Sequence, residues 1–298
     1  MDPLSEVLTL LRPQAYVTGA LKAGGAWALR LPKHAGIKCY LVAKGEASLR
    51  LDGSAEVVRM RQGSCVMMPH GQGFVMGSDL AQQPIDARVL LETVKRLNGV
   101  LQVTEGEEFI VLGCHFDLEG DAGFLLDVLP DVVVLMEEQK ASLGWAIERL
   151  EREISESLPG GSLVTQQVAF ALLVEALRMH LNDEGTGWLF ALSDARMRSA
   201  LEGMHAEPGR EWRLKELAHE AGMSRTSFAQ TFKRMVGEAP MGYLTRWRMT
   251  VAAKRVNERR EPISVIAPSL GYQSESAFSA AFKRHWGVAP REFARTER

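Results

Sequence analysis

A block of thirteen residues occurs twice near the C-terminus: residues 228–240 read FAQTFKRMVGEAP and residues 278–290 read FSAAFKRHWGVAP. The copies share the pattern F-x3-F-K-R-x2-G-x-A-P at an offset of fifty residues. Upstream, Leu217-Ala218 corresponds to Ile266-Ala267 at an offset of forty-nine, so the second copy has one extra residue in its turn. A repeated supersecondary unit is therefore expected here.

Each copy predicts two short helices joined by a tight turn. In the first copy, residues 214–218 carry apolar side chains at the spacing of one helical face, and Gly222 can take the positive φ that ends such a helix. Ser224 is a typical N-cap for a second helix, whose Phe228 and Phe232 lie four residues apart and face the first helix. The second copy repeats these signals with Ser274, Phe278 and Phe282. Each unit is a helix-turn-helix whose second helix has the size of the DNA major groove.

Between the copies, residues 241–257 place apolar side chains at helical spacing and predict one longer helix. A rigid helix would fix the separation of the two units. Helices that read one face of B-DNA enter major grooves about 34 Å apart. A single chain could therefore read two adjacent grooves.

These segments resemble the C-terminal DNA-binding domain of the AraC/XylS family of transcription regulators, over roughly residues 196–298. The matching stretches are LKELAHEAGMSR at 214–225, RWRMTVAAKRV at 246–256 and IAPSLGYQSESAFSAAFKRHWGVAPREF at 266–293. Pro268 departs from a regular helix, where proline costs about 3 kcal/mol, and predicts a kink or a looser second unit.

The resemblance implies contacts to base edges from the outward faces of the two second helices: Arg225, Thr226, Ala229 and Gln230 in the first unit, and Gln273, Glu275, Ser276 and Ser279 in the second. Gln230 is the best single base reader, because glutamine can pair bidentately with adenine. Five cations are expected on phosphates, where they set affinity and register rather than sequence: Lys233, Arg234, Arg248, Lys283 and Arg284.

The distribution of charge agrees with this assignment. From Arg210 onward there are seventeen Lys/Arg and nine Asp/Glu, a balance of +8; the totals of 35 and 37 leave eighteen and twenty-eight before it, a balance of −10. A basic end on an acidic chain is a typical signature of a polyanion-binding module. The length of 298 residues and the hydrophobic fraction of 46% indicate a globular protein of at least two domains.

The N-terminal half contains short apolar runs between Gly, Asp and Pro, which predict strands of a sandwich or barrel: 26–31, 39–42, 47–51, 64–68 and 109–114. Residues 45–53 and 63–71 resemble the two halves of a cupin barrel, similar to the sensor that precedes the DNA-binding domain in many relatives. We expect an α+β chain: a cupin-like ligand-sensing barrel at 1–130, a helical connector at 131–190 and an all-α double helix-turn-helix domain at 191–298.

The barrel residues favour a sensor over an enzyme. Metal-dependent cupins carry an H-x-H…E cluster and a later histidine; here the first motif has only His34, and Phe74 stands at the last position. His34, Cys39, His70, Cys114 and His115 could in principle form a zinc site, but adjacent Cys114 and His115 face opposite sides of a strand. We predict no metal, cofactor or catalytic residue, and a small-molecule pocket lined by Trp27, Tyr40, Met67 and His70. The alternatives are a cupin-type metalloenzyme with an appended DNA-binding domain and a sequence-indifferent nucleoid protein.

The connector predicts two helices, from Leu135 to Ser157 and from Leu163 to Leu181, separated by Leu-Pro-Gly-Gly-Ser. In the family this region often mediates dimerisation; an intrachain hairpin on the barrel is the other reading. The implied partners are double-stranded DNA, an effector, RNA polymerase if the chain is an activator, and a second copy in a homodimer. The three cysteines show no CxxC spacing, and the acidic start lacks the features of a signal peptide, so we expect reduced thiols and a cytoplasmic protein without membrane partners.

Overall fold

The computed structural model describes residues 2–93, 99–136, 141–156, 158–180 and 185–296. Two compact units contain the described residues. One consists of those in Pro13–Asp117 and Leu129–Met179, and the other of those in Met1–Arg12, Leu118–Val128 and His180–Arg298. The chain therefore crosses between the units several times.

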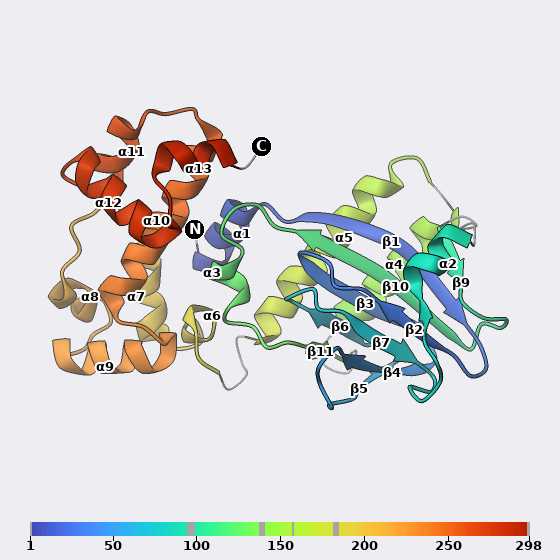
Figure 1. The fold of residues 1–298 in the computed structure, drawn as a ribbon. Coiled ribbons are helices and arrows are strands. Elements are labelled where there is room, and N and C mark those ends of the chain that lie inside the picture. Colours follow the sequence, from blue (N-terminus) through green and yellow to red (C-terminus); the bar gives the residue numbers. More distant parts are fainter. Residues whose placement is uncertain (1, 94–98, 137–140, 157, 181–184, 297–298) are drawn as a thin grey trace. The chain divides into compact units, whose positions relative to one another are not determined.

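The first unit is a β-sandwich of the cupin type, built from two sheets (Figure 1). One sheet has the strand order β11 (Val133–Leu135), β6 (Cys65–Met68), β3 (Ile37–Lys44), β10 (Phe109–Asp117), β1 (Gln14–Ala23) and β9 (Val100–Gln102). The other has the order β5 (Val58–Arg61), β4 (Glu46–Leu51), β7 (Phe74–Gly77), β2 (Ala28–Leu31) and β8 (Ile85–Asp86). The pairs β1–β9 and β2–β8 are parallel, and the other pairs are antiparallel.

Apolar side chains from both sheets meet in one core. Val42 and Val111 come from the first sheet, and Leu29, Leu49 and Phe74 come from the second. All five predicted strands are confirmed, because each run alternates or buries side chains as a sandwich strand does.

The helices of this unit are α2 (Ala87–Thr93), α4 (Ala141–Glu156) and α5 (Gly161–His180). The connector prediction is right about two helices and wrong about where the first begins. Leu135 ends strand β11, paired with Cys65, and α4 starts at Ala141. The predicted helix ends at Ser157 and Leu181 lie outside the described residues.

The second unit is helical. Its elements are α1 (Pro3–Leu11), α3 (Gly123–Leu126), α6 (Trp188–Ala191), α7 (Ala195–Ala206), α8 (Leu214–Glu220), α9 (Arg225–Val236), α10 (Pro240–Glu258), α11 (Ile263–Ser269), α12 (Glu275–Trp286) and α13 (Pro290–Thr296). The expected α+β fold class, with a β-rich N-terminal part and a helical C-terminal part, is confirmed. The predicted domain boundaries at 130 and 190 stay a prediction. The structure groups α1 and α3 with the helical unit, although both precede residue 130 in the chain.

An aromatic cluster joins α3, α6, α7 and α10. The indole Nε1 of Trp188 donates to the carbonyl of Phe124 at 2.8 Å, and His205 stacks on Trp247 with ring centroids 4.0 Å apart. His205 Nε2 also lies 2.7 Å from the Tyr243 hydroxyl. Burial lowers the pKa of His205, against the opposing effect of nearby Glu6 on α1. The neutral ring is therefore the form that the helical core accommodates.

Candidate functional site

The first helix-turn-helix is α8 followed by α9. Gly222, at φ +63°, turns the chain after α8, and the Ser224 hydroxyl accepts from the Ser227 amide at 3.2 Å to cap α9. Phe228 and Phe232 are fully buried. Residues on the opposite face of α9 remain open to a partner.

The second unit repeats this construction in α11 and α12. Gly271 turns the chain at φ +82°, and Ser274 caps α12 by accepting from the Ala277 amide at 3.1 Å. Pro268 lies in the last turn of α11, which ends at Ser269. The backbone bond that proline removes would have reached the carbonyl of Ser264, an exposed residue, so water can satisfy it.

The predicted base readers all belong to these two second helices and their turns. In α9, Arg225, Thr226 and Gln230 are exposed and Ala229 is half-buried. At α12, Gln273, Glu275 and Ser276 are exposed and Ser279 is half-buried. Two similar faces of mainly small or polar side chains therefore lie on twin helices.

Helix α10 joins the two helix-turn-helix units. It begins with Pro240, a residue preorganised for the first helical position, and its 19 residues correspond to a length of about 28 Å. It packs against α9, α11, α12 and α13. The prediction of one long helix between the units is confirmed.

Four of the five predicted phosphate contacts are exposed, in the last turns of α9 and α12: Lys233, Arg234, Lys283 and Arg284. Arg248 differs. Its Nε donates to the carbonyl of Pro208 at 2.6 Å, and its Nη2 donates to the carbonyl of Arg210 at 2.8 Å. The guanidinium ties α10 to the loop before α8, so we withdraw Arg248 from the phosphate-contacting set.

The β-sandwich contains a pocket of about 480 Å³, a size typical of small-molecule sites. Its lining residues are Tyr16, Thr18, Leu31, Pro32, His34, Lys38, Tyr40, Ala87, Arg88, Leu91, Cys114, His115 and Asp117. Of the four predicted lining residues, Tyr40 is present. Trp27 and Met67 are core residues with 3% and 0% exposure, and the His70 ring lies against the carbonyl of Leu129.

Strand register brings the missed lining residues together. Tyr16 on β1 is opposite His115 on β10, and His115 is opposite Lys38 on β3. Residues directly opposite one another share a face of the sheet. These lining residues are brought together by pairing between three distant segments of the chain, which no local sequence pattern reveals.

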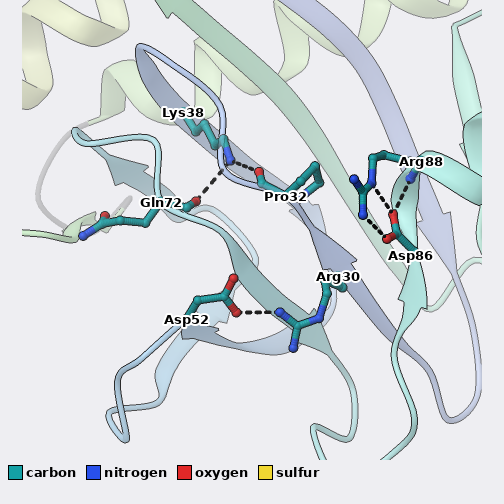
Figure 2. Close-up of polar contacts among 7 residues, drawn as sticks. All are labelled: Arg30, Pro32, Lys38, Asp52, Gln72, Asp86 and Arg88. Carbon is teal, nitrogen blue, oxygen red and sulfur yellow. Dashed lines mark hydrogen bonds and ion pairs between the residues drawn. The ribbon is translucent and has the colours of Figure 1, made fainter.

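Lys38 is a buried cation in the pocket wall, with 5% exposure. Its Nζ donates to the carbonyls of Pro32 at 2.7 Å and Gln72 at 3.1 Å (Figure 2). Burial lowers the pKa of Lys38 to about 8, and the Asp52 carboxylate partly offsets this. Arg88 adds a second cation to the pocket lining and is held by Asp86. The pocket can therefore place positive charge and N–H donors against an acidic group.

Two histidines and one aspartate meet in the same pocket. His115 Nε2 is 3.0 Å from Asp117 Oδ1, and the rings of His34 and His115 lie edge to face with centroids 4.1 Å apart. Burial lowers the pKa of His115, the nearby His34 adds to this effect, and Asp117 opposes it. Phe74, at the position where metal-dependent cupins have their last histidine, is fully buried against Tyr40.

The three cysteines are buried and free of disulfides. Among the helices of the described residues, none has the length and apolar character required to cross a membrane.

Comparison with known proteins supports both units. Residues 2–182 match a family model described as Cupin, and residues 217–296 match one described as Helix-turn-helix domain. AraC-like transcription regulators of Streptomyces antibioticus and Streptomyces lividans are 34% and 33% identical, each over 98% of both chains. The RCS-specific HTH-type transcriptional activator RclR of Escherichia coli is 28% identical over 98% of this chain and 97% of its own. The chain belongs to the AraC family of transcription regulators, with an N-terminal cupin domain and a C-terminal helix-turn-helix domain that binds DNA.

Proposed function

We propose that this regulator recognises specific DNA sites through α9 and α12 and responds to a small molecule bound in the pocket of the β-sandwich. The observation that carries the first part is the matched construction of the two helices. Each has a serine N-cap, two buried phenylalanines and an outward face that holds polar side chains. Helix α10, at about 28 Å, is comparable in length to the roughly 34 Å between successive major grooves.

The test of specificity compares one base reader with one phosphate contact on the same helix. We expect Gln230→Ala to lower affinity for a selected operator by about 5- to 150-fold, the equivalent of about 1–3 kcal/mol for a bidentate base contact. Its affinity for random duplex should change little. Lys233→Ala should weaken both complexes alike and reduce the slope of log affinity against log salt by about 0.9.

The assay is fluorescence anisotropy with the full chain and with an operator obtained by selection from random duplexes. Equal losses on operator and random DNA for Gln230→Ala would remove this residue as a base reader. If the selected and random duplexes bind equally tightly, the chain is a sequence-indifferent DNA binder instead.

We propose that the effector carries an acidic or hydrogen-bond-accepting group that meets Lys38. Two of the three N–H donors of its ammonium are used by backbone carbonyls, which leaves one for a ligand. In a thermal-shift screen, an effector should stabilise the wild-type chain and lose this effect in Lys38→Met. Lys44→Met is the matched control, because Lys44 is an exposed lysine on the same strand β3 and lies outside the pocket lining.

We assign no catalytic residue and treat the chain as a regulator rather than an enzyme. The buried Phe74 supports this, since it fills the position of a histidine that cupin metalloenzymes use. We expect the purified chain to bind its effector without converting it chemically. Conversion of the effector by the purified chain would favour the metalloenzyme alternative.

We also propose a homodimer formed through the connector helices. Trp145 on α4 and Leu163 on α5 are 58% and 65% exposed, and burying both side chains against a second copy would stabilise a dimer. Sedimentation analysis should give a dimer for the wild type and a monomer for the double variant Trp145→Ser, Leu163→Ser. Transcription with purified RNA polymerase then distinguishes activation from repression.

A further inference from the structure

The His34, His115 and Asp117 side chains form a compact donor set. Each offers one ligand atom, and the three atoms lie within 4.8 Å of one another. Two atoms bound at about 2.0–2.2 Å to one ion are about 3–3.5 Å apart at tetrahedral or octahedral angles. The 3.0 Å separation of His115 Nε2 and Asp117 Oδ1 already falls in this range.

The hydrogen bonding of His34 prepares one nitrogen for a metal. His34 Nδ1 lies 2.5 Å from the carbonyl of Ala35, which can only accept a hydrogen bond. The proton is therefore assigned to Nδ1, and Nε2 keeps its lone pair. A carbonyl that fixes the ring of a metal-binding histidine in this way is a common arrangement around metal ions.

We propose that His34, His115 and Asp117 bind a divalent transition-metal ion of the zinc or iron(II) class in the wall of the pocket. Two imidazoles and one carboxylate suit these ions, and three protein ligands leave coordination positions open. The open positions would be filled by water or by an oxygen of a small molecule in the pocket. This site differs from the histidine-rich set of cupin metalloenzymes, because Phe74 replaces one member of that set.

The surrounding charges are compatible with an ion of this kind. Lys38 lines the same pocket, but its Nζ donates to two backbone carbonyls, and Arg88 is paired with Asp86. With Asp117 as ligand, a divalent ion leaves the site with one net positive charge. An anionic oxygen ligand would neutralise this charge, which links the ion to the acidic class of effector proposed above.

The experiment is a titration of the full chain with Co²⁺ and then Zn²⁺, after treatment with a chelator and removal of any polyhistidine tag. We expect one equivalent of Co²⁺ to bind with a dissociation constant of about 10 μM or tighter and to give visible d–d absorption. Zn²⁺ should displace it. His115→Ala and the nearly isosteric Asp117→Asn should each weaken binding at least about 100-fold, because even loss of a supporting hydrogen bond around a metal costs 10- to 100-fold.

His70→Ala is the matched control. His70 also lies near an aspartate, with Nε2 3.9 Å from Asp131 Oδ1, but has no place in the three-residue set. Its metal affinity should equal that of the wild type. Circular dichroism checks that each variant is folded, and Asp117→Asn keeps the test valid should His115→Ala fail to fold.

Three results would overturn the proposal: no stoichiometric binding by the wild type, binding that survives both ligand variants, or an equal loss in His70→Ala. An intense thiolate-to-cobalt charge-transfer band would also overturn it, since the buried cysteines would then be the ligands. The titration is performed without DNA and without an effector, so it decides metal binding separately from the proposed effector response. Only the regulatory consequence of metal binding rests on the proposed function.

Discussion

Replacing Arg248 with methionine should weaken the fold of the helical unit without removing a phosphate contact. The guanidinium donates to the carbonyls of Pro208 and Arg210, which precede the first helix-turn-helix unit. Arg248 itself lies on α10, which joins the two helix-turn-helix units. Its Nη2 would be 3.0 Å from a Cβ built on Gly271, so it also fills space beside the turn of the second unit. Arg248 thus connects α10 to the loop before α8 and to the turn before α12.

The size of the effect follows from the two hydrogen bonds. A bond to a charged group is worth about 1.5–3 kcal/mol, and the half-exposed position lets water satisfy part of what is lost, so the pair should contribute about 2–3 kcal/mol. Methionine keeps much of the aliphatic volume and removes all five donors. We therefore expect the free energy of unfolding to fall by about 2–3 kcal/mol in Arg248→Met.

Two measurements separate this role from a phosphate contact. Urea unfolding followed by far-ultraviolet circular dichroism gives the stability of the full chain, and anisotropy titrations give the dependence of DNA affinity on salt. Arg248→Met should lower stability and leave the salt slope unchanged, whereas Arg234→Met and Lys283→Met should each reduce the slope by about 0.9. A reduced slope with unchanged stability for Arg248→Met would refute the reasoning.

Two further predictions concern the helical unit. Gly237→Ala should destabilise the chain by about 1 kcal/mol, because Gly237 has a φ of +91° at the end of α9. Gly242→Ala, inside α10, should stabilise it by about 0.5–1 kcal/mol. Urea unfolding tests both variants, and equal effects on the free energy of unfolding would contradict this account. Since burial lowers the folded-state pKa of His205 below its unfolded value near 6.5, stability should be complete above about pH 6.5 and decline below it. His205→Phe should flatten that decline in an acid titration of stability; a decline of the same size would instead assign it to other groups.

Local signals predicted the double helix-turn-helix well. The pairs Phe228–Phe232 and Phe278–Phe282 lie one helical turn apart, and the glycines that end each helix stand at positive φ. These constraints act within about a dozen residues, so they need no knowledge of distant contacts. The same holds for the five predicted strands, whose short apolar runs between Gly, Asp and Pro are visible in the sequence.

Long-range pairing decided what could not be predicted. The pocket wall depends on the register that sets Tyr16, His115 and Lys38 side by side across three strands. Arg248 looked like a surface cation because its acceptors, Pro208 and Arg210, lie about forty residues earlier in the chain. Trp27 and Met67 follow strand alternation, but that alternation does not distinguish the open part of a sandwich interior from its packed part.

Chain connectivity offers a route by which the pocket could influence DNA binding. His115 and Asp117 lie at the end of β10, and only residues 118–122 separate this strand from α3. Phe124 of α3 packs on Tyr243 and Trp247 of α10, with ring centroids 5.7 and 5.4 Å apart, and α10 contacts both α9 and α12. A ligand shifts the equilibrium between two conformations of a protein only by the difference between its affinities for those two conformations. If an effector or ion binds His115 and Asp117, residues 118–122 give it a covalent connection to α3, and the contacts of Phe124 continue that connection to α10.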